Sequence, residues 1–127
     1  MPTLTLLHNP HCSTSVHALD ALEAAGRAVR VRKYLLVKER LSAQELRELA
    51  GRLQGDPVDA LVRRDANYKK LGLELDGADL DTVVATLAAH PSLLQRPILD
   101  DGEAAMIGRP RARAAAWAAA GKVVEAE

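Results

Sequence analysis

The fold is decided by a strand, a loop and the start of a helix in residues 3–15, whose sequence is TLTLLHNPHCSTS. Threonine and leucine alternate from Thr3 to Leu7, which predicts a strand, and the turn-forming residues around Pro10 predict a loop. Apolar residues at helical spacing then predict a helix that begins near Ser15 and stops at Gly26.

A second strand is expected over Ala28–Tyr34, where apolar and basic residues alternate, so that one face is buried and the other is wet. The connection between the two strands contains a helix and is too long for a hairpin. By the crossover rule, this connection predicts a parallel pair of strands.

The middle of the chain, about residues 41–91, is predicted to be a helical insertion. A capping box in Ser42–Glu45 starts its first helix, and Pro91 stops its last one. The expected elements are a helix from Ser42 to Leu53, a short helix at Pro57–Arg63, a turn at Tyr68–Leu73 and a helix from Leu80 to His90.

The C-terminal part completes the sheet. A hairpin is expected from Ile98–Leu99 and Ala104–Ile107 around an Asp-Asp-Gly-Glu turn. A last helix, Pro110–Ala120, is expected to pack on the sheet through Trp117. The order of elements predicts one α/β domain over residues 1–127, with a small mixed sheet and helices on its faces.

Composition excludes several classes of function. The 127 residues carry 17 Lys and Arg against 17 Asp and Glu, and 2% are aromatic, which disfavours nucleic-acid binding. A hydrophobic share of 48% and a charged share of 27% are typical of a globular chain. The N-terminus has no basic leader, and its apolar run is far shorter than the roughly 20 residues that span a bilayer. We expect a cytoplasmic protein without a membrane partner.

Cys12 is the single cysteine and lies where the predicted loop meets the helix. The thiolate is the reactive form, and its pKa falls near a helix N-terminus, near cations and near hydrogen-bond donors. The expected sources are the free N–H groups of the helix start, the hydroxyls of residues 13–15 and a cationic His8. The pattern predicts a nucleophile whose redox partner is another molecule.

Two other interpretations use the same residues. A lone cysteine is often a small buried hydrophobe, although the loop and capping residues around Cys12 argue against a place in the core. A zinc site from His8, His11, Cys12 and His17 is disfavoured because adjacent side chains diverge and the ligands span a strand, a loop and a helix. We therefore expect no metal.

Four arginines near the ends of elements are candidates for binding a tetrahedral oxyanion: Arg63, Arg64, Arg96 and Arg109. Each one alone is typical of a solvated surface charge. Arg96 and Arg109 differ from the others because each directly precedes a proline, which would hold it rigidly.

Four ordered motifs resemble the glutaredoxin-coupled arsenate reductase family, in the branch with a thioredoxin-like fold. The motifs are HNPHCSTS at 8–15, YKKLGL at 68–73, HP at 90–91 followed by QRPI at 95–98, and IGRP at 107–110. The resemblance runs along most of the chain. It implies a thioredoxin-like domain with a four-stranded mixed sheet flanked by helices.

The resemblance also implies a reaction. Cys12 matches the nucleophile that attacks arsenate to form an arseno-cysteine, which glutathione attacks before glutaredoxin releases arsenite. His8 matches the residue that lowers the pKa of the thiol, and Ser15 matches a hydroxyl that supports the same anion. Arg96 and Arg109 match two residues that bind the oxyanion.

Further positions follow from the resemblance. Pro97 matches the cis-proline of thioredoxin-like proteins, and Ser15 stands where a Cys-x-x-Cys protein has its resolving thiol, so an external thiol must complete the cycle. Family members commonly have an arginine at the position of Val16. Asp59 stands where one branch has an oxyanion-binding arginine, and Arg63, four positions later, is expected to replace it.

The leading hypothesis is a monomeric arsenate reductase of arsenic detoxification, with no bound cofactor, glutathione as co-substrate and glutaredoxin as partner. The second is a glutathione-linked thiol oxidoreductase on the same scaffold without arsenate activity. The third is an Spx-like regulator that binds RNA polymerase and is not an enzyme. The regulator ranks last because the chain lacks a Cys-x-x-Cys switch and because Arg96 and Arg109 would have no task in it.

Overall fold

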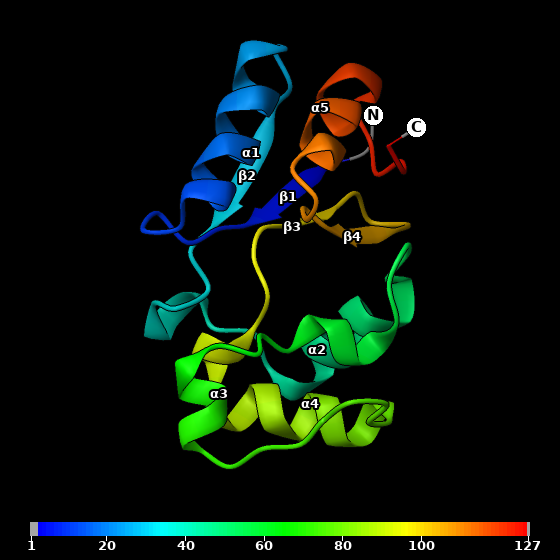
Figure 1. The fold of residues 1–127 in the computed structure, drawn as a ribbon. Coiled ribbons are helices and arrows are strands. Elements are labelled where there is room, and N and C mark those ends of the chain that lie inside the picture. The colour runs from blue at the N-terminus through cyan, green and yellow to red at the C-terminus, as the bar shows by residue number, and fades with distance from the viewer. Residues whose placement is uncertain (1–2, 127) are drawn as a thin grey trace.

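A four-stranded mixed sheet with the order β2-β1-β3-β4 separates two layers of helices in this computed structural model, which describes residues 3–126 (Figure 1). The strands are β1 (Leu4–Leu7), β2 (Val29–Arg32), β3 (Ile98–Asp100) and β4 (Ala105–Ile107). Strand β1 is parallel to β2 and antiparallel to β3, and β3 and β4 form a hairpin. The predicted α/β class, parallel pair and C-terminal hairpin are confirmed.

Helices cover both faces of the sheet (Figure 1). One layer contains α1 (Ser13–Ala24) and α5 (Ala112–Ala120), and the other contains α2 (Ala43–Arg52), α3 (Ala66–Lys70) and α4 (Leu80–Ala89). Short 3-10 turns lie at Val37–Glu39, Val58–Leu61 and Pro91–Leu93. Within residues 3–126, no helix is both long and apolar enough to cross a bilayer.

Side chains of β1, β3 and β4 contribute to two hydrophobic cores, one on each face of the sheet. Leu6 packs in the core that contains α1, α5 and the fully buried Trp117, as the sequence predicts for that tryptophan. Its neighbour Leu7 packs in the other core, with Leu49 of α2 and Val83 of α4. Because successive residues of a strand point to opposite faces, one short sheet organises both cores.

Three elements differ from the sequence-based expectation. Helix α1 starts at Ser13 rather than near Ser15, and the expected helix at Pro57–Arg63 is a 3-10 turn. The first half of the expected turn at 68–73 belongs to helix α3, because the Asp65 carboxylate accepts from the Tyr68 N–H at 3.1 Å and caps a short helix, and the turn itself follows at 71–72.

The second strand also differs from expectation. Strand β2 lies at the edge of the sheet, and its apolar residues, Val29 and Val31, are half-buried rather than buried. Its Arg32 is half-buried as well, because the guanidinium makes two hydrogen bonds to Glu45 of α2, at 2.6 and 3.1 Å. The predicted division into a buried apolar face and a wet basic face is wrong for this strand.

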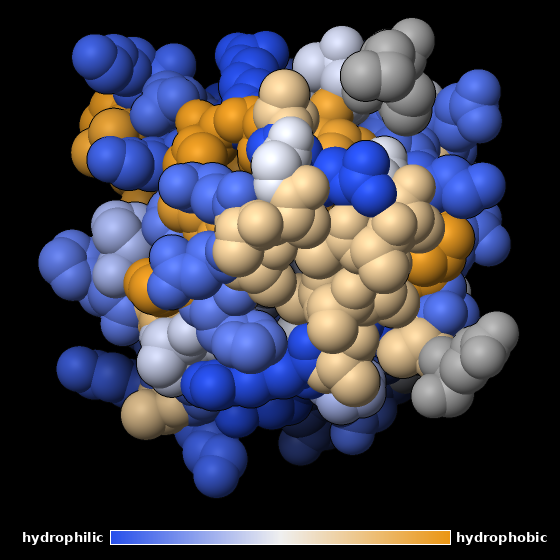
Figure 2. Space-filling view, turned by 90° about the horizontal axis from the view of Figure 1, so that it is seen from above, coloured by the Kyte–Doolittle hydropathy of each residue, from blue (hydrophilic) through white to orange (hydrophobic). Residues whose placement is uncertain are grey.

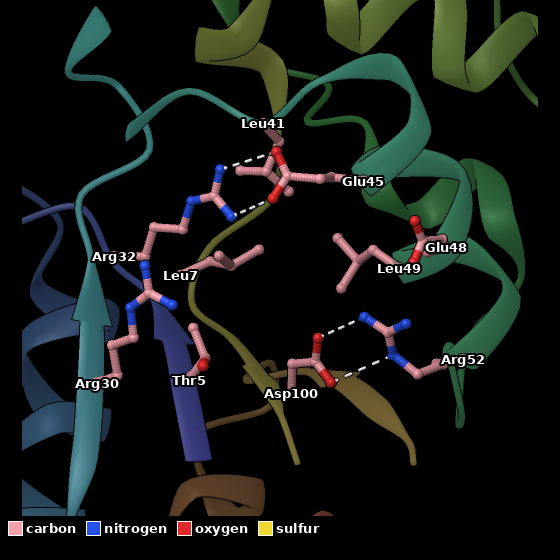
Figure 3. Close-up of a pocket in the computed structure, with 10 residues that line it drawn as sticks. All are labelled: Thr5, Leu7, Arg30, Arg32, Leu41, Glu45, Glu48, Leu49, Arg52 and Asp100. Atoms are coloured by element: carbon pink, nitrogen blue, oxygen red, sulfur yellow. Dashed lines mark hydrogen bonds and ion pairs between the residues drawn. The ribbon is translucent and has the colours of Figure 1, made fainter. Parts of the chain in front are cut away.

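Two ion pairs join the sheet to α2 on either side of a cavity of about 160 Å³ (Figure 3). One is the pair of Arg32 and Glu45, and the other joins Arg52 to Asp100 at 2.6 and 3.3 Å. Leu49 points between them (Figure 3). Each pair is bidentate, which fixes the angle at which α2 meets the sheet.

On the end of the molecule with the last turns of α1 and α5, moderately hydrophobic side chains form a patch bordered by hydrophilic ones (Figure 2). The exposed alanines at this end of the two helices are Ala24, Ala25, Ala119 and Ala120. Gly26 ends α1 with a φ of 74°, in the left-handed region that favours glycine, as the sequence predicts. The first turn of α1, which follows Cys12, lies at the opposite end.

Candidate active site

The sheet ends in a row in which Leu7, Ile98 and Ile107 are neighbours on adjacent strands. The loop after β1, the segment before β3 and the turn after β4 therefore emerge at one edge. These three segments bring together residues far apart in the sequence, because they carry Cys12, Arg96 and Arg109. Nη2 of Arg109 donates to the Cys12 sulfur at 3.4 Å.

Cys12 occupies the N-cap position of α1, with an extended backbone (φ −106°, ψ 118°) and a half-buried side chain. Burial acts to raise the pKa of its thiol. The backbone N–H of Ser15, the side chain of Arg96, the backbone N–H of Thr14 and the charge of Arg109 together outweigh burial and lower that pKa. The helix start and the arginines thus both favour the thiolate.

His8 contacts Ser15 rather than the sulfur. Its Nδ1 lies 2.7 Å from the Ser15 hydroxyl, which also accepts from the Asn9 N–H at 3.1 Å. Burial, together with the charge of Lys33, lowers the pKa of His8 below its ordinary value, although Asp20 acts in the opposite direction. The structure therefore gives the imidazole a positioning contact in place of the expected cationic contact with sulfur.

Hydrogen bonds to two backbone carbonyls hold the segments of Arg96 and Arg109 together. Nε of Arg109 donates to the Arg96 carbonyl at 3.0 Å, and the Gly108 N–H donates to the Pro97 carbonyl at 2.8 Å. A Cβ at position 108 would lie 2.6 Å from Cγ of Pro97, so only glycine allows this approach. The Arg96–Pro97 peptide is cis, and so is Arg109–Pro110, which the sequence did not predict.

Arg63 reaches the same region through an isolated bridge that pairs Val62 with Leu94. Its Nη1 donates to the Gln95 side chain at 3.1 Å, and the Gln95 oxygen also accepts from the Arg96 N–H at 3.3 Å. A cavity of about 300 Å³ is lined by Arg63, Arg64, Asp65, Gln95 and Arg109. Arg63 and Arg109 thus line the same open cavity, and the Gln95 side chain contacts both Arg63 and the backbone of Arg96.

Asp59 and Val16 are the two positions that depart from the family pattern. The Asp59 carboxylate accepts from Arg64 at 3.2 Å and from the Gly77 N–H at 3.0 Å. Its charge is therefore paired with Arg64, which also binds the carboxylate of Asp76 at 3.2 Å. Val16 is exposed on the first turn of α1.

Sequence reasoning missed Arg111. Its Nε donates to the Thr14 hydroxyl at 3.3 Å, and its Nη2 donates to the Ser13 hydroxyl at 3.0 Å. Because a guanidinium only donates, both hydroxyls accept from it, and their own protons are left for other acceptors. The sequence signal for it was a further arginine two positions after Arg109, in the turn between β4 and α5.

The four residues of the zinc interpretation do not converge. His11 and His17 are exposed, whereas His8 is buried against Ser15. Within the part of the chain that the structure describes, no group of three or more His, Cys, Asp or Glu side chains is arranged to hold a metal ion.

Comparison with protein families gives a match, in which the model of the ArsC family matches residues 7–117. The chain belongs to the ArsC family. The predicted resemblance to arsenate reductases and the thioredoxin-like fold are thereby confirmed.

Arsenate reductases of other organisms align with most of this chain. An arsenate reductase of Neisseria meningitidis serogroup A is 40% identical over 111 residues, which are 87% of this chain and 93% of the relative. An arsenate reductase of Haemophilus influenzae is 36% identical over 111 residues, covering 85% and 92% of the two chains. The solved arsenate reductase from Vibrio cholerae superimposes with a TM-score of 0.74 at 36% identity, covering 86% of this chain and 92% of that one.

Proposed function

We propose that this protein reduces arsenate to arsenite through a covalent adduct on Cys12, with glutathione and glutaredoxin as electron donors. One observation carries the proposal, namely that Arg109 donates to the Cys12 sulfur at 3.4 Å. A guanidinium in this position favours the thiolate and lies beside the attacking atom, where its paired donors fit the oxygens of a tetrahedral anion. The relatives named arsenate reductase support this choice of substrate.

Two further arginines offer donors to the same anion. Nε of Arg96 is buried and has no hydrogen-bond partner within residues 3–126, whereas Nε of Arg63 lies 3.5 Å from a carboxylate oxygen of Asp65. Buried donors are normally satisfied, so the N–H of Arg96 favours an oxyanion as its partner, and Arg63 lines the cavity that Arg109 also lines. The N–H groups at the start of α1 add donors that favour negative charge.

The electron balance supports external thiols. Reduction of arsenate to arsenite takes two electrons, and Cys12 is the single cysteine, so no disulfide can form within the chain. Two external thiols must therefore supply the electrons and leave joined as a mixed disulfide. Glutathione and the thiol of glutaredoxin meet this need.

The steps follow from this balance. The Cys12 thiolate attacks arsenic, and one oxygen leaves as water. The glutathione sulfur then displaces a second oxygen, again as water. The glutaredoxin thiolate attacks the glutathione sulfur, and the electron pair of the broken sulfur–arsenic bond reduces the arsenic. Water releases arsenite from Cys12 and restores the thiolate.

The experiment measures arsenite formed by the purified protein from arsenate, with glutathione and glutaredoxin supplied together and then omitted in turn. Arsenite is expected only with both donors, and Cys12→Ser is expected to form none. Arg109→Gln should lose most of the activity. The matched surface variant Arg47→Gln should keep it, because Arg47 of α2 forms an exposed ion pair with Asp81 of α4.

Two results would overturn the proposal. A folded protein that forms no arsenite at any arsenate concentration with both donors would remove the substrate. Activity in Cys12→Ser would remove the nucleophile. If arsenite formation fails while glutaredoxin still reduces a mixed disulfide between Cys12 and glutathione, the glutathione-linked thiol oxidoreductase takes its place.

A further inference from the structure

Large apolar side chains are exposed mainly in two segments next to the Cys12 loop. Those exposed within residues 3–126 are Val16, Leu35, Leu36, Val37 and Leu71. Leu36 is 47% exposed and Val37 is 80% exposed. Single exposed apolar residues are ordinary, but a run of three followed by charged residues is typical of an interaction surface.

The first segment is the start of α1. The Val16 N–H donates to the Cys12 carbonyl at 3.0 Å, in the first turn of the helix that Cys12 caps. An exposed valine therefore stands one turn from the thiol. At the other end of α1 the exposed apolar residues are the small side chains of Ala24 and Ala25.

The second segment leaves β2 beside the same loop. The His8 N–H donates to the Arg32 carbonyl at 2.9 Å, so the chain after Arg32 starts at the active-site edge of the sheet. Tyr34, the residue before Leu35, is buried, and its hydroxyl donates to the Leu94 carbonyl at 3.2 Å, which holds it against the segment that carries Arg96. In Figure 1 the teal turn at 37–39 lies on the same side of the molecule as the dark-blue loop that leads into α1.

The charges around this second segment are mostly positive. Lys33, Lys38 and Arg40 are exposed within residues 33–40, against the single carboxylate of Glu39. Arg109 and Arg111 add two cations on the other side of the loop. Although the whole chain has no net charge, the rim of the site therefore favours an acidic partner.

We propose that Val16, Leu35, Leu36 and Val37, here called the thiol-side patch, dock a thiol-donor protein of the glutaredoxin type, whose cysteine is surrounded by apolar side chains and an acidic rim. The inference rests on the proposed function, in which glutaredoxin must reach the adduct on Cys12 in every cycle because the chain has a single cysteine. An apolar centre with a charged rim is the usual composition of a transient interface.

The docking can be tested without arsenate. Cys12 is first converted with glutathione disulfide into a mixed disulfide with glutathione. The glutaredoxin thiolate then attacks the glutathione sulfur, the old S–S bond breaks, and Cys12 leaves as the thiolate. Glutaredoxin is oxidised to its own mixed disulfide while Cys12 is reduced, so no further reactant is needed.

The experiment compares the rate of this reduction by glutaredoxin with the rate for dithiothreitol, a small thiol that needs no docking. The double variant Leu36→Ser with Val37→Ser is expected to react about tenfold more slowly with glutaredoxin and at an unchanged rate with dithiothreitol. Leu71→Ser is the matched control, because Leu71 is 42% exposed and follows α3, in another part of the chain. Lys38→Glu should slow only the glutaredoxin reaction, and more strongly at low salt.

The outcomes separate the proposals. Unchanged rates with glutaredoxin in both the double variant and Lys38→Glu overturn the docking surface, and so does an equal loss with dithiothreitol. A native protein that sediments as a dimer, together with a double variant that is monomeric, would assign the patch to a second copy of this chain instead. Failure to form arsenite, with the glutaredoxin effect retained, removes the arsenate activity and keeps the docking surface.

Discussion

At the scale of single residues, the hydrogen bond between His8 and Ser15 is the main departure from a simple thiol–imidazole pair. The imidazole is buried and bonds the Ser15 hydroxyl at 2.7 Å, while the Ser15 N–H acts on the Cys12 sulfur. His8 thus affects the thiolate through the position of Ser15. Arg109, in contrast, acts directly on the sulfur.

This difference predicts a coupled pair of substitutions. His8→Ala and Ser15→Ala should each slow alkylation of Cys12 by iodoacetamide roughly fivefold at neutral pH, as expected for losing one hydrogen bond of about 1 kcal/mol. The double variant should be little slower than either single variant, because both remove the same contact. The measurement is the alkylation rate against pH, and each variant should need a higher pH than the native protein.

The control combines His8→Ala with Arg109→Gln, where the two effects should add because the residues reach the thiol separately. Full additivity between His8 and Ser15 would instead show that His8 acts on the sulfur by its own charge.

At the scale of elements, Glu45 of α2 links this helix to β2 through its ion pair with Arg32. Its carboxylate binds Arg32 and accepts from the Ser42 N–H at 3.0 Å, as the other half of the predicted capping box. Hydrogen bonds from Arg32 and Ser42 lower the pKa of Glu45 from 4.5 to about 2. The stabilising contribution is therefore fully present above pH 4.5 and is lost as the pH falls toward 2.

Glu45→Gln should lower the free energy of unfolding by about 1 kcal/mol at neutral pH, because the side chain is partly exposed and its ion pair is screened by solvent. The difference from the native protein should shrink when unfolding by urea is measured near pH 2, where the native carboxylate is half protonated. A difference that stays constant across this range would assign the effect to packing rather than charge.

Arg113 of α5, which is 5% exposed, also links separate elements of the fold. Its guanidinium binds Asp56 and Glu125 and donates to the Ile107 carbonyl at 3.1 Å and to the Arg109 carbonyl at 3.0 Å. It therefore ties the last helix to the loop after α2, to the C-terminal segment and to the turn that carries Arg109.

Arg113→Met should destabilise the protein by about 3 kcal/mol, because the substitution leaves carboxylates and carbonyls without their buried donor. Arg47→Met is the comparison, since Arg47 and Asp81 form an exposed pair at 2.7 Å whose loss should cost well under 1 kcal/mol. Urea unfolding measures both. Equal losses in the free energy of unfolding for the two substitutions would contradict the proposed role of Arg113 in linking these elements.

At the scale of the whole molecule, both cores depend on the same short strands. Trp117 reports on the core between the sheet and the pair α1 and α5, whereas most other helical residues belong to the opposite layer. Since Leu6 and Leu7 are adjacent and point into different cores, loss of one core should disrupt the other.

The two layers should therefore unfold together. Tryptophan fluorescence and far-ultraviolet circular dichroism should give the same urea midpoint, which is the usual test of a two-state transition. A circular dichroism midpoint at lower urea would instead show that the helical stretch around 41–91 unfolds as a separate unit.

Sequence patterns predicted the elements whose formation depends on residues close together in the chain. Strand alternation at 3–7, the capping box at Ser42 and the turn at Gly102 each rest on nearby residues, and these elements formed where expected. The start of α1 has no side-chain cap to mark it, and the existence of α3 depends on the single cap of Asp65, which is a weak signal within a turn-rich sequence.

The site was less predictable because its contacts cross the molecule. Cys12 and Arg109 are 97 positions apart, and their approach follows from the register of β1, β3 and β4, which the sequence does not state. The roles of Arg111 and Gln95 likewise depend on segments that meet only in the folded sheet. The His8 contact could not be anticipated because it depends on the rotation of one turn of α1.

Gly108 has a consequence for how such a site can be altered. With Pro97 against one side and Trp117 at 3.1 Å from a Cβ placed there, position 108 has no free volume. The spacing between Arg96 and Arg109 is therefore coupled to the packing of a tryptophan in the interior. Anyone redesigning this protein for a larger anion must repack the interior and reshape the pocket in the same step, since neither can be enlarged alone.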